Sequence, residues 1–181
     1  MLENIDSLNE ADFMPRIDEF TLKIVSTSEE ADEMRADGVD FRFWPLNYRD
    51  GLDKGAIAFC VFVGGELANI GWIYMTEKAK ECMEQSRHKV DFQNGEVCEG
   101  GLVTNPKYRG MGLATYIYFK RNQFCRDTGK TIVRSAVVTD NIAPHRMMAK
   151  FDTKIYAEGR QLRVLWWHSW KEKPLDNRSS L

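Results

Sequence analysis

The chain has 181 residues, of which 43% are hydrophobic and 29% charged, a composition that fits a single globular domain with a sizeable core. Its formal net charge of −2 leaves no strongly basic surface, which argues against nucleic acid as a partner. No apolar run approaches the roughly 20 residues that span a bilayer, and the polar first 16 residues do not resemble a signal peptide. We therefore expect a cytoplasmic protein with no membrane partner.

The first third of the chain predicts a strand, a helix and an irregular segment. Residues 20–25 alternate apolar and polar side chains, as in a half-buried strand. Residues 26–37 follow as a helix, with Ser28 as its N-cap and Gly38 at its end. Residues 39–55 interleave aromatic and charged side chains, and we interpret them as an irregular segment beside a pocket.

A β-hairpin is expected next. The apolar runs 56–63 and 66–75 are joined by Gly64 and Gly65, which supply the positive φ angles of a two-residue turn. Residues 76–85 predict a short helix, and a polar loop leads from it to the next strand.

The second half continues the alternation of strands and helices. A strand is expected over 96–104, interrupted by Gly100 and Gly101, and glycines inside a strand suggest a bulge or close approach of a ligand. A helix over 112–128 and a strand over 131–138 follow. The whole order predicts a mixed α/β (α+β) fold, with one sheet and helices on both of its faces.

The end of the chain predicts one more helix and a hairpin. Asn141 can cap a helix that carries Met147, Met148 and Phe151 on its apolar side. Residues 154–156 and 162–167 suggest a closing hairpin around Glu158-Gly159, and residues 171–181 form a polar tail.

Cysteine and histidine usage argues against a metal site. The cysteines show no CxxC spacing, and the three histidines are scattered far from them. We expect free thiols, mostly buried. The cysteines are Cys60, Cys82, Cys98 and Cys125.

The most informative segment runs from the end of the 96–104 strand into the 112–128 helix. A helix start exposes unpaired N–H groups and the positive end of the helix dipole, which suits a pyrophosphate. Gly110 and Gly112 allow the backbone to approach a ligand closely, and Arg109 adds a cation. The spacing partly mimics a dinucleotide fingerprint, but Thr115 stands where the third glycine belongs. A Walker loop is excluded because no Gly-Lys-Ser/Thr occurs.

The run Arg109-Gly110-Met111-Gly112-Leu113-Ala114 resembles the signature of the GNAT superfamily of CoA-dependent N-acyltransferases. The approach Asn105-Pro106-Lys107-Tyr108 and the later Val137-Val138-Thr139-Asp140-Asn141 are similar to the same family. The resemblance implies a splayed central sheet over a domain of residues 17–172, with a lead-in over 1–16 and a tail over 173–181.

The resemblance also implies where acetyl-CoA or another acyl-CoA binds, with no metal. The co-substrate would lie in the gap between the 97–104 and 131–138 strands, its pantetheine arm paired with backbone like an added strand. Main-chain N–H groups from Arg109 to Ala114 would hold the pyrophosphate, and Asn141 would touch the pantetheine arm, although it is equally suited to cap a helix. The expected cofactor-binding residues are Leu102, Val103, Thr104, Arg109, Gly110, Met111, Gly112, Leu113, Ala114 and Asn141.

Catalysis is less clearly marked. Members of the family often use a carboxylate on the strand before the glycine turn as general base, and Glu99 stands at that place, with Glu96 as second choice. Strand alternation points the two to opposite faces, and either could be a solvated edge residue. Met148 occupies the usual position of the tyrosine that protonates the leaving thiol, and a thioether cannot donate a proton.

The departure at position 148 leaves three explanations open. Solvent can protonate the thiolate, another residue can replace the tyrosine, or the protein only binds acyl-CoA. The nearby candidates for replacement are His145, Tyr156 and Tyr118.

The acceptor side would be built from residues 26–55, 76–95 and the last hairpin. Its aromatic and arginine residues fit either an aromatic or anionic acceptor or a packed cluster with solvated arginines. These residues are Phe41, Phe43, Trp44, Tyr48, Arg42 and Arg49. Trp166, Trp167 and Trp170 would close the core, or else line an apolar acyl channel.

We therefore expect an N-acyltransferase, with acetyl as the favoured group, that acts directly on the amine of a small molecule or peptide. One alternative is a non-catalytic acyl-CoA-binding module. Another is an N-acyl amino acid synthase that takes long chains from acyl carrier protein. A homodimer is left open.

Overall fold

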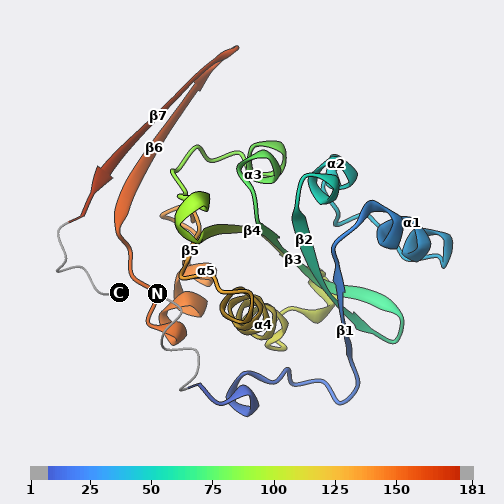
Figure 1. The fold of residues 1–181 in the computed structure, drawn as a ribbon. Coiled ribbons are helices and arrows are strands. Elements are labelled where there is room, and N and C mark those ends of the chain that lie inside the picture. The colour runs from blue at the N-terminus through green and yellow to red at the C-terminus, as the bar shows by residue number, and fades with distance from the viewer. Residues whose placement is uncertain (1–7, 176–181) are drawn as a thin grey trace. The chain divides into compact units, whose positions relative to one another are not determined.

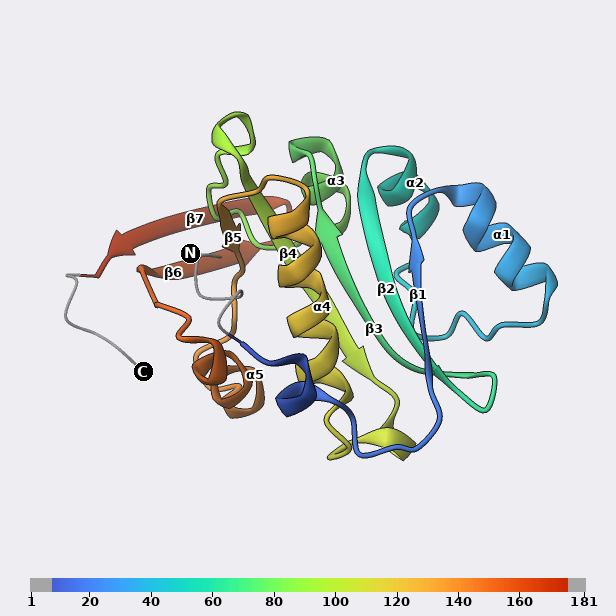
Figure 2. The same cartoon turned by 60° about the horizontal axis from the view of Figure 1, so that its bottom comes forward.

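The computed structural model describes residues 8–175, which divide into two compact units (Figures 1 and 2). The first unit consists of residues 8–84 and 90–135, and the second of residues 85–89 and 136–175. The predicted bounds of lead-in, domain and tail stay a prediction. Of those segments, residues 1–7 and 176–181 lie outside the described residues.

A mixed five-stranded sheet forms the centre of the first unit. Its strands are β1 (Thr21–Val25), β2 (Ala56–Val63), β3 (Glu66–Tyr74), β4 (Glu96–Thr104) and β5 (Ile132–Arg134). They lie in the order β1-β2-β3-β4-β5, antiparallel throughout except for the parallel pair β4 and β5. The predicted hairpin at Gly64 and Gly65 is the β2–β3 connection, and the mixed α/β fold class is confirmed.

Three short helices cover one face of this sheet (Figure 1): α1 (Ser28–Ala36), α2 (Tyr48–Asp53) and α3 (Glu77–Met83). They pack on the sheet through an apolar cluster that includes Met34, Leu52 and Trp72. The N-cap of α1 is Thr27, not the predicted Ser28, and its hydroxyl and the Glu30 carboxylate complete a capping box.

The long helix α4 (Leu113–Asp127) covers the opposite face. Leu113 and Ile117 are fully buried there against β-strand residues such as Phe59 and Ile73. The expected helix over 112–128 is thus confirmed to within one residue. Beside α4 runs the segment that contains the 3-10 helix η2 (Glu10–Phe13) (Figure 2).

The second unit carries a helix and a hairpin that forms a two-stranded sheet of its own, so the expectation of a single sheet is wrong. Its elements are α5 (Ile142–Met148), the 3-10 turn η5 (Ala149–Phe151), β6 (Ala157–Val164) and β7 (Trp167–Pro174). The hairpin turns between β6 and β7, so the predicted turn at Glu158-Gly159 is wrong. Gly159 instead pairs with Glu172 inside the hairpin, where a Cβ would lie 2.3 Å from the Trp170 ring. The first residues of the predicted tail belong to β7.

The thiols mostly follow the prediction. Cys60, Cys98 and Cys125 are buried, Cys82 is half-buried, and none of these four forms a disulfide bond.

Candidate active site

Strand β4 changes its pairing in the middle. On one side, Trp72 of β3 faces Gly100 while Ile70 faces Val103, so β4 carries one extra residue between these pairs. Gly101, with φ +56°, occupies this bulge, which confirms the predicted interruption. On the other side, β5 pairs only with Glu96, Val97 and Cys98. Among the described residues, no strand of this sheet pairs with the rest of that β4 edge.

The short length of β5 is a correction to the predicted strand 131–138, which ends in the structure at Arg134. Its consequence is a splay between two parallel strands, because β4 continues to Thr104 without it. The main chain around Leu102, Val103 and Thr104 therefore borders an open strand edge, and such an edge can pair with an extended ligand.

The turn after β4 is held by a single carboxylate. Glu66, at the start of β3, accepts hydrogen bonds from the Asn105 amide at 3.1 Å and the Tyr108 hydroxyl at 2.8 Å, and pairs with the Lys107 ammonium at 2.7 Å. Lys107 and Tyr108 lower the pKa of Glu66 to about 2. The 3-10 turn η4 (Pro106–Tyr108) is thereby fixed to the sheet. Glu66 was missed in the sequence, because nothing there links it to residues about 40 positions later.

Two glycines then lead into α4. Gly110 has φ +78° and Gly112, the N-cap, has φ +86°, conformations that side chains with a Cβ rarely adopt. No side chain caps this helix start, and a Cβ at Gly110 would meet nothing within 4 Å among the described atoms. The turn is thus open on the side of Gly110, where the exposed Arg109 also stands. Unpaired N–H groups at an open helix start fit a pyrophosphate.

The opposite side of this turn is covered by the chain itself. The Arg16 amide donates a hydrogen bond to the Met111 carbonyl at 2.8 Å, and Pro15 lies in ordinary contact with the Cβ position of Gly112. Phe13 stacks on Phe119 of α4, with ring centroids 5.1 Å apart. This segment therefore supports the turn from behind.

The predicted base Glu99 is 4% exposed and faces α4. Its Oε2 atom lies 3.1 Å from Nη2 of Arg121. The other terminal nitrogen of Arg121, Nη1, donates to the carbonyls of Trp72 and Gly100 at 3.0 and 3.2 Å. Burial raises the pKa of Glu99, and the charge of Arg121 opposes that rise. These surroundings favour a structural role, while the catalytic role of Glu99 stays a prediction. Nothing in the sequence identifies Arg121 as its partner.

The second candidate, Glu96, is engaged by β5. Arg134 donates to both of its carboxylate oxygens, from Nε at 3.0 Å and from Nη2 at 2.5 Å. Hydrogen bonding from Arg134 is the main cause of the lowered pKa of Glu96. A carboxylate held in this way is a poor proton acceptor.

Most of the remaining predicted residues lie in the second unit. Asn141 is the N-cap of α5, but its side chain makes no capping hydrogen bond, so its predicted part in binding stays a prediction. Met148 is buried, and Nε2 of His145 lies 3.3 Å from the Val138 carbonyl oxygen. Tyr156 is 39% exposed, whereas Tyr118, in the first unit, is buried on α4.

 

The aromatic residues predicted on the acceptor side form a packed cluster. Trp44 lies at the centre of this cluster, with its ring centroid 4.3 Å from Phe41, 5.1 Å from Tyr48 and 5.3 Å from Trp72. Arg42 and Arg49 form exposed ion pairs with Asp40 and Asp32. These contacts confirm the interpretation of the aromatic residues as a packed cluster, with Arg42 and Arg49 exposed to solvent.

The tryptophans near the C-terminus do not behave alike. Trp166 is 88% exposed between β6 and β7, and Trp170 packs over Gly159 inside the hairpin. The side chain of Trp167 lies outside what the structure describes. A role of these residues in an acyl channel stays a prediction.

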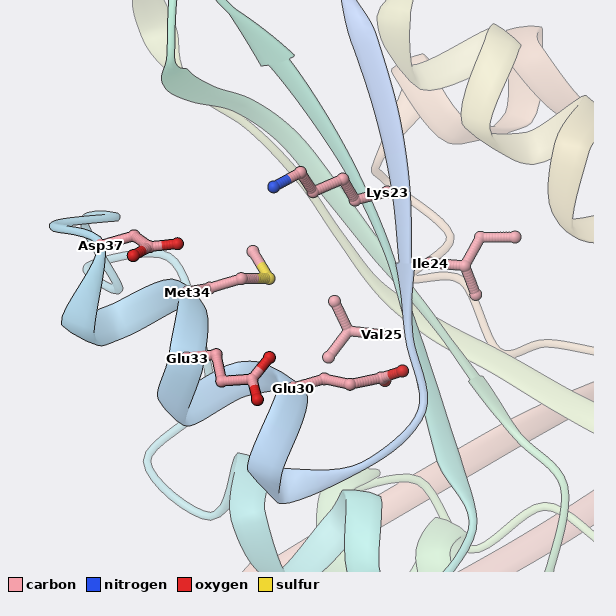
Figure 3. Close-up of a pocket in the computed structure, with 7 residues that line it drawn as sticks. All are labelled: Lys23, Ile24, Val25, Glu30, Glu33, Met34 and Asp37. Atoms are coloured by element: carbon pink, nitrogen blue, oxygen red, sulfur yellow. The ribbon is translucent and has the colours of Figure 1, made fainter.

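A surface depression lies at the other end of the sheet, between β1 and α1 (Figure 3). Its polar lining is mostly acidic, with Glu30, Glu33 and Asp37 facing Lys23. It contains none of the predicted site residues. Within residues 8–175, no cluster of side chains could hold a metal ion, and no helix is both long and apolar enough to cross a membrane.

Comparisons with known proteins agree with this geometry. The model of the acetyltransferase (GNAT) family matches residues 19–152. Among curated protein sequences, none matches this chain significantly.

Solved structures show the same fold at low sequence identity. A transcriptional regulator from Bacillus halodurans C-125 aligns with a TM-score of 0.56 at 12% identity, over 81% of this chain and 100% of its own. The aminoglycoside N-acetyltransferase AAC(6')-Iy in complex with CoA gives 0.52 at 11% identity, over 81% and 97%. The aminoglycoside 6'-N-acetyltransferase AAC(6')-Ih from Acinetobacter baumannii gives 0.51 at 14% identity, over 82% and 97%.

Proposed function

Because this chain belongs to the GNAT acetyltransferase family, we propose that it moves an acetyl group from acetyl-CoA directly to a primary amine of a small molecule or peptide. Acyl-CoA is the co-substrate of this enzyme family. The observation that carries the proposal is the splayed edge of β4, which ends at the open glycine turn of α4. One end of acyl-CoA would be held by the turn and the other by the strand.

The fit of this chain to acyl-CoA is supported by backbone geometry. The amides from Arg109 to Ala114 would hold the pyrophosphate, since a Cβ at Gly110 points into open space. The pantetheine arm, which carries two amide groups, would pair with β4 near Val103 and Thr104 as an added strand.

Direct transfer is supported by the state of the thiols. Burial raises the pKa of Cys60, Cys98 and Cys125, so these thiols stay protonated and are poor nucleophiles. An acyl-cysteine intermediate on any of the three is therefore disfavoured. The acceptor amine would attack the thioester in a complex that holds both substrates.

Two solved structures with this fold are named as aminoglycoside acetyltransferases, which makes aminoglycosides a reasonable first class of amine to test. A cytoplasmic location also remains a prediction.

Release of free CoA thiol tests the proposed function. The protein is mixed with acetyl-CoA and one amine from a panel that holds kanamycin, spermidine, an amino acid amide and a short peptide. We expect thiol release that depends on one class of amine, with a matching acetylated product by mass spectrometry. Tight binding of acetyl-CoA without turnover on any amine would contradict it and favour the non-catalytic module. In a parallel reaction with a long-chain acyl carrier protein as donor, acylation from that donor alone would favour the N-acyl amino acid synthase.

A further inference from the structure

A carboxylate and a phenol meet over the bulge of β4, on the face opposite α4. A Cβ placed on Gly100 would lie 2.5 Å from Oε2 of Glu84 and 3.1 Å from the hydroxyl of Tyr74. A side chain at position 100 would therefore displace the carboxylate. Glu84 follows α3 as its C-cap, and Tyr74 ends β3, so three elements converge on this point.

This point lies at the start of the splay. Gly100 is two residues beyond Cys98, the last residue of β4 that pairs with β5. From Gly100 to Thr104 the strand spans about 13 Å, at about 3.3 Å for each residue. A pantetheine arm that runs back along β4 from the glycine turn would therefore bring its thioester toward Gly100.

We propose that Glu84 is the proton acceptor for the attacking amine, an inference that rests on the proposed N-acetyltransferase function. The acceptor ammonium gives one proton to the Glu84 carboxylate, directly or through a water. The neutral nitrogen attacks the thioester carbonyl carbon, so that the C–N bond forms and the C–S bond breaks. The second proton of the nitrogen goes to the leaving sulfur to give CoA thiol, and Glu84 returns its proton to solvent.

Glu84 is more exposed to solvent than Glu99, the residue that the sequence predicts as the proton acceptor. Glu84 is half-buried and can exchange a proton with solvent, whereas Glu99 is 4% exposed and paired with Arg121 on the other face. The predicted interruption of the strand at Gly100 coincides with the proposed catalytic position. The carboxylate at that position belongs to Glu84, at the end of α3.

The charged and titratable neighbours of Glu84 come from three elements. Tyr74 of β3 and Cys98 of β4 have raised pKa values, for which burial is the main cause and the charge of Glu84 the second. Lys80, four residues earlier on α3, has the opposite effect on Cys98. The carboxylate thus lies near groups that include two neutral side chains, Tyr74 and Cys98, and the Lys80 ammonium.

The test replaces Glu84 by Gln and measures acetylation of the panel amine that the wild-type protein acetylates fastest. We expect kcat to fall at least about 100-fold, which is typical for loss of a general base. The acid limb of the pH profile of kcat/KM should disappear, while calorimetry gives an acetyl-CoA Kd within about twofold of the wild type. Unchanged binding also shows that the variant is folded.

Three further variants sharpen the result. Glu81→Gln, on an exposed part of α3, should keep wild-type turnover. Glu84→Asp should retain part of the activity and the acid limb, because it keeps a carboxylate. Gly100→Ala should lower kcat without weakening acetyl-CoA binding, because its Cβ displaces the Glu84 carboxylate.

A Glu84→Gln protein with kcat within threefold of the wild type and an intact acid limb would overturn the assignment, while the proposed function would stand. A wild-type protein that binds acetyl-CoA but acetylates no amine would overturn both. The two failures are therefore distinguishable.

Discussion

Arg121 is the side chain on which the local geometry of β4 depends most directly. It is buried, and its guanidinium joins the Trp72 carbonyl of β3 to the Gly100 carbonyl at the bulge. Burying this cation is expensive unless a counter-charge accompanies it, and Glu99 supplies that charge at 3.1 Å. The sequence suggests Glu99 as a base, but its buried position is explained by its ion pair with Arg121 of α4.

Replacing Glu99 by Gln should therefore act on stability. We expect the free energy of unfolding to fall by about 3 kcal/mol, because Arg121 keeps its buried charge without a counter-ion. Urea denaturation followed by tryptophan fluorescence measures the change. As a control, Asp50→Asn at the exposed pair with Lys54 should cost less than about 1 kcal/mol. Unchanged stability combined with lost turnover would restore Glu99 as the base.

Glu66 gives a prediction about pH. Its pKa is lowered to about 2 in the folded protein, chiefly by Lys107, so its stabilising contribution is complete above the ordinary glutamate pKa of about 4.5. That contribution is lost as the pH falls from about 4.5 toward 2. The Glu66→Gln variant should show a smaller loss of stability over this range than the wild type. Parallel acid denaturation curves for the two proteins would argue against the carboxylate as the anchor of the turn.

At the scale of elements, the start of α4 combines a backbone with positive φ angles and a surface that is open at Gly110. Gly110 and Gly129 make this combination testable, since they flank the same helix at its two ends. Both have positive φ, +78° and +74°, and at neither would a Cβ meet an atom within 4 Å among the described residues. Gly110 lies at the proposed pyrophosphate site, whereas Gly129 follows the other end of α4.

Replacing either glycine by Leu should destabilise the protein by about 1–2 kcal/mol through left-handed backbone strain. Only Gly110→Leu should weaken CoA binding, by at least tenfold in Kd, because its side chain occupies the space of the pyrophosphate. Isothermal calorimetry on both variants separates the two effects. Equal affinity in Gly110→Leu and Gly129→Leu would mean that the turn does not contact CoA.

Glycine also explains which elements could be predicted from the sequence. At Gly64-Gly65 and Gly110-Gly112 the residue supplies a positive φ, and the turns there were predicted correctly. At Gly51 its missing side chain makes room for Met83, so α2 packs on α3 although the segment looked irregular. Gly159 likewise makes room for Trp170, so the predicted turn is a strand instead.

At the scale of the whole molecule, the order of strands and helices in the first unit followed from hydrophobic periodicity and turn residues. The ion pairs in this unit could not be predicted in the same way. Glu66 pairs with Lys107, and Glu99 with Arg121, only because the tertiary fold brings them together. The glycine turn was visible in the sequence because its residues are contiguous. The Glu84 carboxylate beside Gly100 could not be predicted from the sequence, because Glu84 follows α3 and Gly100 belongs to β4.

The central proposal for this molecule is that the main chain at the start of α4 binds the pyrophosphate of CoA. Calorimetric titration of the wild-type protein with CoA and, separately, with pantetheine tests it, because pantetheine lacks the pyrophosphate and the nucleotide. We predict that CoA binds at least 100-fold more tightly than pantetheine, a difference of about 2.7 kcal/mol. Equal affinities for the two compounds, or no heat with CoA, would contradict the account.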